Sequence, residues 1–176
     1  MKSLKMIIKL SALIMSFASL AMADGPNIAL GQPGTASGMY APYIIENAFD
    51  GDEETYWNAG GYGGHWIEVD LGADTIIGSM RMKAAMSPNG GTTQVITGRT
   101  ESGDTVTLWS FAGYTTNGQW LENLSIEIPT AVRYVRVTTP STPSWVAWSE
   151  IEVFEGSTVP TDDLSWSAFK AMYRSE

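Results

Sequence analysis

The chain has 176 residues, with 10 Lys and Arg against 19 Asp and Glu, and its formal charge is −9. This acidic balance argues against a nucleic-acid-binding protein, because affinity for phosphate backbones depends on clustered Lys and Arg. The absence of cysteine excludes a disulfide framework, a thiol nucleophile and a Cys-ligated zinc site, and a single histidine excludes an HExxH metal centre. A composition with 18 Gly, seven Trp and only 16% charged residues favours a secreted all-β domain over a helical cytosolic enzyme.

The first 23 residues have the organisation of a secretory signal peptide. Lys2 and Lys5 precede an apolar stretch that extends to Met22, and residues 21–23 provide a small-residue cleavage site. The apolar run after Lys9 is too short to span a bilayer comfortably, which argues against a membrane anchor. We therefore expect secretion to the periplasm or the cell exterior, with no transmembrane segment after cleavage.

Alternating apolar and polar residues predict short strands between residues 66 and 154. The segments that show this pattern are 66–71, 76–83, 106–110, 124–128, 133–138 and 148–154. Clusters of Gly, Asn, Ser and Pro separate them, and no long helical pattern intervenes. The arrangement predicts an antiparallel sandwich or barrel over residues 24–155.

A separate linker and tail follow at residues 156–176. Apolar residues from Leu164 to Tyr173 fall at helical spacing, with Asp162 and Asp163 before them and Lys170 and Arg174 near the end. The pattern predicts either a short helix that docks on a partner or a weakly docked terminal tail.

Five motifs in order resemble the discoidin, or coagulation factor V/VIII type C, superfamily. They are the opening 27–37, the acidic segment 47–57, and the segments 66–72, 133–137 and 149–153. The resemblance extends over about residues 27–154 and is closest to bacterial family 32 carbohydrate-binding modules. It implies a galactose-binding-like jelly-roll β-sandwich and a non-catalytic, lectin-like function.

The acidic segment concentrates oxygen donors on a tight, Gly-containing turn at residues 50–55, and hard cations such as Ca²⁺ prefer oxygen ligands of this kind. The resemblance implies a structural calcium that ties this turn to the last strand. The implied ligands are the carboxylates of Asp50 and Glu150, the hydroxyl and carbonyl of Thr55, and the backbone carbonyls of Asn47, Asp52 and Ser149. The alternative is an Asx-turn without metal.

The resemblance also implies that ligands bind to the loops at one end of the sandwich, here residues 37–44, 58–65, 86–94 and 140–146. A sugar site needs an aromatic platform beside a few orienting polar groups. The candidates are the rings of Trp145, Tyr40 and Tyr62 and the side-chain amides of Asn89 and Gln94. Galactose-binding members usually carry a histidine in the first loop and an arginine in the third, and this chain has neither there.

Two other functions remain open at this point. The same loops would suit an extracellular adhesion module that binds a cell-surface protein or a membrane, although they lack the Lys and Arg that favour anionic lipids. A glycosidase would need a carboxylate pair, for which Glu68, Asp70, Glu150 and Glu152 are available. These residues alternate along strands as solvent-facing residues do, and no nucleophile–base pair accompanies them. The sequence thus favours a binding module for a glycan or polysaccharide.

Overall fold

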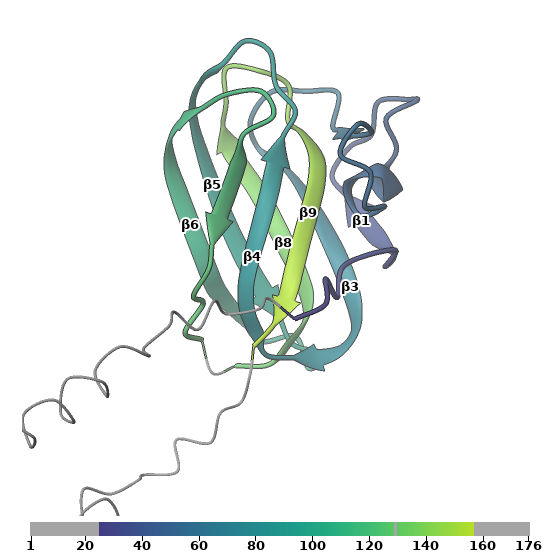
Figure 1. Ribbon diagram of the computed structural model, residues 1–176, viewed down its shortest axis with the longest axis vertical. Helices are drawn as coiled ribbons and strands as arrows, with labels where there is room; N and C mark the ends of the chain where they lie inside the picture. Colours follow the sequence, from purple (N-terminus) through teal and green to yellow (C-terminus); the bar gives the residue numbers. More distant parts are fainter. Residues whose placement is uncertain (1–24, 129, 157–176) are drawn as a thin grey trace, which may run out of the picture.

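The computed structural model describes residues 25–128 and 130–156, so the predicted signal peptide and the C-terminal tail lie outside the described residues. Within this range the chain forms two antiparallel sheets packed face to face, as the sequence predicts (Figure 1). The elements in chain order are β1 (Gly34–Ala36), the 3-10 helix η1 (Ile45–Ala48), β2 (Trp57–Asn58), β3 (His65–Thr75), β4 (Ile77–Ala84), β5 (Gly90–Arg99), β6 (Thr105–Thr115), β7 (Trp120–Asn123), β8 (Val132–Ser141) and β9 (Ala147–Glu155). Across these ranges no helix has the length and apolarity that a bilayer crossing requires.

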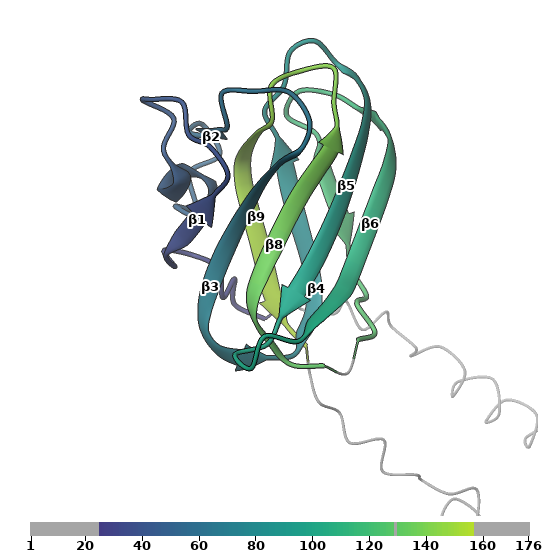
Figure 2. The same ribbon diagram turned by 180° about the vertical axis from the view of Figure 1, so that it is seen from behind.

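One sheet has five strands in the order β1-β3-β8-β5-β6, and the other has four in the order β2-β9-β4-β7. Figure 2 shows the five-stranded sheet in front, with β4 and β9 behind it. The core between the sheets is built from the inward-facing residues of both, including Trp57, Ile67, Met80, Met82, Ile96, Val137 and Ile151. Burial of each such side chain contributes about 1.5–3 kcal/mol, so the alternation that predicts the strands also provides most of the stability.

Four strands differ from the sequence prediction, and β1 and β2 are two of them, because both precede residue 66, where the first strand is predicted. β5 lies at Gly90–Arg99, where no strand is predicted, and β7 lies at Trp120–Asn123 rather than at 124–128. Leu124 is exposed beyond the end of β7, whereas Ile126 is buried in the connection to β8. In β5 the inward positions include Thr92 and Gln94, and polar residues at buried positions hide the alternation.

The turns at one end of the sandwich come together above β4 and β9 (Figure 1). They are the segment before β3 and the connections β4–β5, β6–β7 and β8–β9. The excursion that carries β1, η1 and β2 packs beside them, because β2 pairs with β9 through Trp57↔Trp148 and Asn58↔Ala147. The loops that the sequence assigns to ligand binding therefore share one end of the fold.

Candidate functional site

The acidic turn is folded around the Thr55 hydroxyl. Thr55 Oγ1 donates a hydrogen bond to Asp50 Oδ2 at 2.8 Å and lies 3.1 Å from the carbonyl oxygen of Asp52 and 3.5 Å from that of Asn47. Gly51 makes the turn possible with a φ of +78°, a conformation that favours glycine. Four of the six predicted metal ligands thus converge at one point.

The fifth, Glu150 on β9, reaches the same turn across the fold. Its Oε2 accepts a hydrogen bond from the Gly51 amide at 3.1 Å, whereas its Oε1 is buried and has no hydrogen-bond partner among the residues that the structure describes. Burial raises the pKa of the Glu150 carboxyl to about 8; the Gly51 hydrogen bond opposes this rise and the Asp50 charge adds to it. A buried carboxylate with a free oxygen beside a second carboxylate is the environment that a divalent cation would neutralise.

The donor set fits calcium through mixed oxygen ligands rather than through a carboxylate cluster. No group of three His, Cys, Asp or Glu side chains placed to hold a metal occurs in the part of the chain that the structure describes. Asp52 does not add a third carboxylate to the set, because its Oδ1 accepts a hydrogen bond from the Glu54 amide at 3.0 Å and its backbone carbonyl is the group that faces Thr55. Two carboxylates, a hydroxyl and backbone carbonyls are suitable ligands for Ca²⁺.

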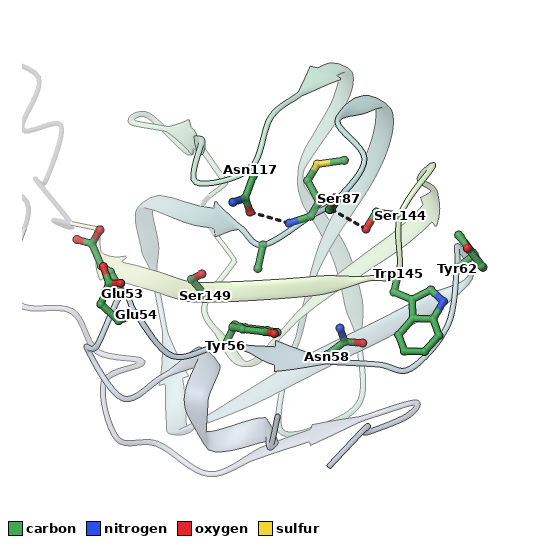
Figure 3. A pocket seen from close by; sticks show the side chains of 12 residues that line it. Glu53, Glu54, Tyr56, Asn58, Tyr62, Ser87, Asn117, Ser144, Trp145 and Ser149 are labelled. Carbon is green, nitrogen blue, oxygen red and sulfur yellow. Dashed lines mark hydrogen bonds between the residues drawn. The ribbon is translucent and has the colours of Figure 1, made fainter. Parts of the chain in front are cut away.

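The sixth predicted ligand, Ser149, occupies a β-bulge. Lys83 pairs with Glu150 and Ala84 pairs with Trp148, so Ser149 is an extra residue in β9 opposite β4. The bulge changes the alternation, and Trp148 and Ile151 both belong to the core. β-Bulges are common beside functional sites because they re-aim a side chain. Here the bulge turns the Ser149 side chain into a groove next to the acidic turn (Figure 3).

This groove has a volume of about 630 Å³, within the range of sites for small ligands. It is lined by Glu53, Glu54, Tyr56, Asn58, Tyr62, Ala85, Met86, Ser87, Asn117, Ser144, Trp145 and Ser149. Figure 3 shows Trp145 and Tyr62 at one end, Tyr56, Asn58 and Ser149 along its length, and Glu53 and Glu54 at the other end. It combines exposed rings with neutral hydroxyl and amide groups, as a sugar site requires.

The aromatic side chains continue beyond the groove as a row of rings in contact with one another, in which Tyr40 and Tyr43 connect the two pairs. Tyr40 meets Trp145 edge to face at 5.3 Å between centroids, and Tyr43 stacks on Tyr56 at 4.2 Å. The hydrogen bond between the Tyr56 and Tyr43 side chains, which favours the protonated phenol of Tyr56, is the main reason that the pKa of Tyr56 is raised to about 12, and burial adds to it. These contacts hold the rings in place before any ligand binds, which lowers the entropic cost of binding.

The five predicted ligand residues have different positions. Trp145 and Tyr62 line the groove, and Tyr40 lies outside it against Trp145. Asn89 is not a lining residue, and its Oδ1 accepts the Asn117 amide at 2.8 Å, so it positions the β6–β7 turn. Gln94 has to be corrected: it is only 2% exposed on β5 and accepts a hydrogen bond from Thr139 at 2.6 Å, so it is part of the core and not of a loop.

Several lining residues were not expected from the sequence. Asn117 lies in a turn that the sequence marks by Thr116, Asn117 and Gly118, but that turn was not assigned to the ligand end. Glu53, Glu54 and Tyr56 belong to the acidic segment, whose turn the sequence assigns to the metal alone, whereas Asn58 lies in the predicted ligand loop 58–65. The acidic segment serves both regions, because Asp52 and Thr55 face the turn while Glu53 and Glu54 line the groove.

The other strand carboxylates are engaged in ion pairs. Glu68 on β3 binds Arg99 and Arg136, each at 3.0 Å, and Asp70 binds Arg133 at 2.8 Å. On β9, Glu152 pairs with Arg81. Neither Glu68, Asp70 nor Glu152 lines the groove. Glu68 and Asp70 line a separate, smaller pocket, and Arg99, Arg136 and Arg133 hold their carboxylates in ion pairs.

His65 lies at the start of β3, where its ring contacts a serine hydroxyl. His65 opens β3, and its Nδ1 lies 3.0 Å from the Ser37 hydroxyl. The Ser37 hydroxyl also accepts a hydrogen bond from the Trp66 amide at 2.9 Å. His65 thus joins the start of β3 to the segment after β1.

The fold is similar to that of several solved carbohydrate-binding domains. It matches the lectin-binding domain of lectinolysin in complex with Lewis b with a TM-score of 0.61 and 20% identity, over 74% of this chain and 96% of that one. The family 32 carbohydrate-binding module of C. perfringens NanJ, in complex with galactose, matches with a TM-score of 0.63 and 16% identity, over 75% and 98% of the two chains. Chitosan-binding module 1 of a chitosanase/glucanase from Paenibacillus sp. IK-5 matches with a TM-score of 0.59 and 25% identity, over 73% and 98%.

A search of curated proteins gave no match. The family model for the F5/8 type C domain, in contrast, matches residues 33–153, most of the sandwich. The chain therefore belongs to the F5/8 type C, or discoidin, domain family, with the jelly-roll sandwich that its solved relatives share.

Proposed function

We propose that this protein is a secreted, non-catalytic glycan-binding module that recognises its ligand in the groove between Trp145 and Glu54. The observation that carries the proposal is the groove itself: about 630 Å³, open to solvent, with Trp145 and Tyr62 exposed beside hydroxyl and amide groups. Sugars present an apolar face to a ring and hydroxyls to polar side chains, so the two kinds of group are complementary to one ligand.

The solved relatives support a glycan as the ligand. The domains with similar folds were crystallised with Lewis b or galactose, or are described as binding chitosan. These ligands differ from one another, so the relatives support the class of ligand and leave its identity to the residues of this groove. The predicted signal peptide is the reason to propose secretion.

A glycan array followed by calorimetry with the best ligand tests the proposal. Trp145→Ala should weaken binding at least tenfold, because stacking on an aromatic platform is a main source of affinity in such sites. The matched control is Tyr114→Ala, which removes an aromatic side chain that is 68% exposed on β6 and does not line the groove. Equal losses in both variants, or no binding to any glycan, would contradict the proposal.

Adhesion to a protein or a membrane remains the alternative. Met39, Tyr40 and Ile44 are exposed near the groove and give this end some apolar surface. Binding to a protein partner with silence on every glycan would favour adhesion, and flotation with liposomes would identify a membrane ligand.

We also propose that calcium binds at the Asp50–Glu150 turn as a structural ion. Asp50, Thr55 and Glu150 would hold it through side chains, and Asn47, Asp52 and Ser149 through carbonyls. The ion would satisfy Glu150 Oε1 and join the acidic turn to β9, a role that disulfides cannot play in a chain without cysteine. Chelation should lower the melting temperature and added calcium should restore it; a melting temperature that does not respond to calcium would exclude the site.

A further inference from the structure

The charge of the groove is concentrated at one end and has one sign. Of the lining residues, only Glu53 and Glu54 carry a charge at neutral pH, and no Lys, Arg or His lines the groove. Figure 3 shows both carboxylates at the end opposite Trp145 and Tyr62. A ligand that spans the groove therefore meets rings at one end and negative charge at the other.

The two glutamates are not equivalent. The Lys83 ammonium lies 2.6 Å from Glu53 Oε2 and compensates that charge. The Glu54 side chain has neither a hydrogen bond nor an ion pair with any residue in the described ranges, since only its backbone amide is engaged, with Asp52. Glu54 is thus the uncompensated carboxylate of the groove.

A second observation indicates that this end receives a ligand. Ser149 is only 8% exposed, it lines the groove, and its hydroxyl has no hydrogen-bond partner among the described residues. The Ser149 oxygen is not itself buried and is reached from the groove, so a hydroxyl held there by the bulge is free to hydrogen-bond a bound molecule. Tyr56 and Asn58 line the groove between Ser149 and Trp145 in Figure 3, so the middle of the groove offers hydroxyl and amide groups to a polar ligand.

We infer that the groove selects glycans that carry a free, protonated amine, such as oligosaccharides of 2-amino-2-deoxy sugars, with Glu54 as the partner of the ammonium group. This inference rests on the proposed glycan-binding function and specifies its ligand. Hydrogen bonds between ammonium and carboxylate groups are roughly twice as strong as neutral ones. A sugar with a carboxylate or a sulfate would be repelled, and a neutral sugar would leave the charge of Glu54 uncompensated. Ser149 binds a hydroxyl of the same ligand, and Trp145 stacks on a sugar ring at the other end.

Calorimetry with two trisaccharides of equal length, one of glucosamine and one of N-acetylglucosamine, tests the inference with calcium present throughout. The amine form should bind roughly two- to fivefold more tightly, the size expected for one charge-assisted contact at the exposed Glu54 carboxylate. Added salt should reduce this preference. Glu54→Gln should remove the preference for the amine form, so that the two trisaccharides bind this variant with equal affinity.

The matched control is Glu127→Gln, which changes the net charge equally at an exposed position between β7 and β8, away from the groove. This variant should keep the preference. Equal or tighter binding of the acetylated trisaccharide, or a preference that survives in Glu54→Gln, would overturn the inference and leave glycan binding intact. Failure of the unmodified protein to bind any glycan would instead overturn the proposed function together with the inference.

Discussion

At the scale of single residues, one ion pair on β3 lowers the pKa of the Asp70 carboxyl. Arg133 donates two hydrogen bonds to Asp70, from Nε to Oδ1 at 2.8 Å and from Nη2 to Oδ2 at 3.0 Å. This bidentate contact is the main reason that the pKa of Asp70 is lowered, and the Gly72 amide adds to the effect. The Asp70 carboxylate is thereby held in an ion pair that stabilises the fold.

Asp70→Asn should change how stability depends on pH. A carboxyl whose pKa is lower in the folded than in the unfolded state stabilises the fold above the unfolded pKa, and this contribution is lost as pH falls through the folded pKa. The wild type should therefore lose about 1 kcal/mol from this pair below the ordinary aspartate range, and Asp70→Asn should lose less in acid. Urea unfolding at a series of pH values measures both slopes, and identical slopes would contradict the assignment.

Gly51 is a second residue on which the acidic turn depends, because the turn needs its positive φ and its amide donates a hydrogen bond to Glu150. A Cβ added there would meet the Leu30 side chain at 2.9 Å. Gly51→Ala should destabilise the domain by about 1–2 kcal/mol and weaken calcium binding. Gly91→Ala is the control, since Gly91 has no positive φ and no atom within 4 Å of an added Cβ. Similar unfolding free energies for the two variants would contradict this role.

The sequence predicts some of these residues better than others. The residues proposed to hold calcium come from one short segment and the last strand, and hydrogen bonds bring five of them together, while Trp145 and Tyr62 line the groove; their roles stay predictions. Gln94 could not be placed correctly, because a polar residue gives no sign in the sequence that Thr139 will satisfy it inside the core. The unpartnered hydroxyl of Ser149 depends on a bulge, which requires knowledge of the partner strand.

At the scale of elements, the predicted strands follow the hydrophobic alternation, and the errors occur where that pattern fails. β3, β4, β8 and β9 have aliphatic residues at nearly every inward position and lie within a few residues of their predicted bounds. β5 has Thr92, Gln94, Ile96 and Gly98 inward, and hydrogen bonds to Thr115 and Thr139 replace apolar packing. Side-chain pairing of this kind is visible only when both strands are known.

The bulge in β9 gives a prediction at this scale. Deletion of Ser149 leaves Trp148 and Ile151 inward with Glu150 outward between them, which is regular alternation opposite Lys83 and Ala84. We expect the deletion variant to remain folded and, with chelator present in both samples because Ser149 is also a proposed calcium ligand, to melt within roughly 5 °C of the wild type; it should bind glycan several-fold more weakly. Ser149→Ala, which keeps the bulge and removes only the hydroxyl, should lose part of the affinity.

Calorimetric binding and thermal unfolding together distinguish a loss of glycan affinity caused by the missing hydroxyl or bulge from one caused by unfolding of the domain. An unfolded deletion variant would mean that the bulge is required by the fold, and full affinity in both variants would remove Ser149 from the groove.

At the scale of the whole molecule, the acidic turn and the groove share their backbone. Asp50, Asp52 and Thr55 face the proposed metal, whereas Glu53 and Glu54 in the same segment line the groove, and β9 supplies Glu150 and Ser149 to the two regions in turn. An ion that fixes the turn therefore also fixes one wall of the glycan site before the ligand arrives.

Calcium and glycan should consequently bind with positive coupling. We expect chelation to weaken glycan binding roughly fivefold, and glycan to raise calcium affinity by the same factor, because coupling between two binding sites is reciprocal. Titrations of each ligand with and without the other measure both factors, and Glu150→Gln should abolish the effect of calcium on the glycan. Trp145→Ala is the complementary control, since it should weaken glycan binding without altering calcium affinity in the absence of glycan. If chelation lowered the melting temperature but left glycan affinity unchanged, the groove wall would be held by β2 and β9 alone, and calcium would stabilise the fold without organising the site.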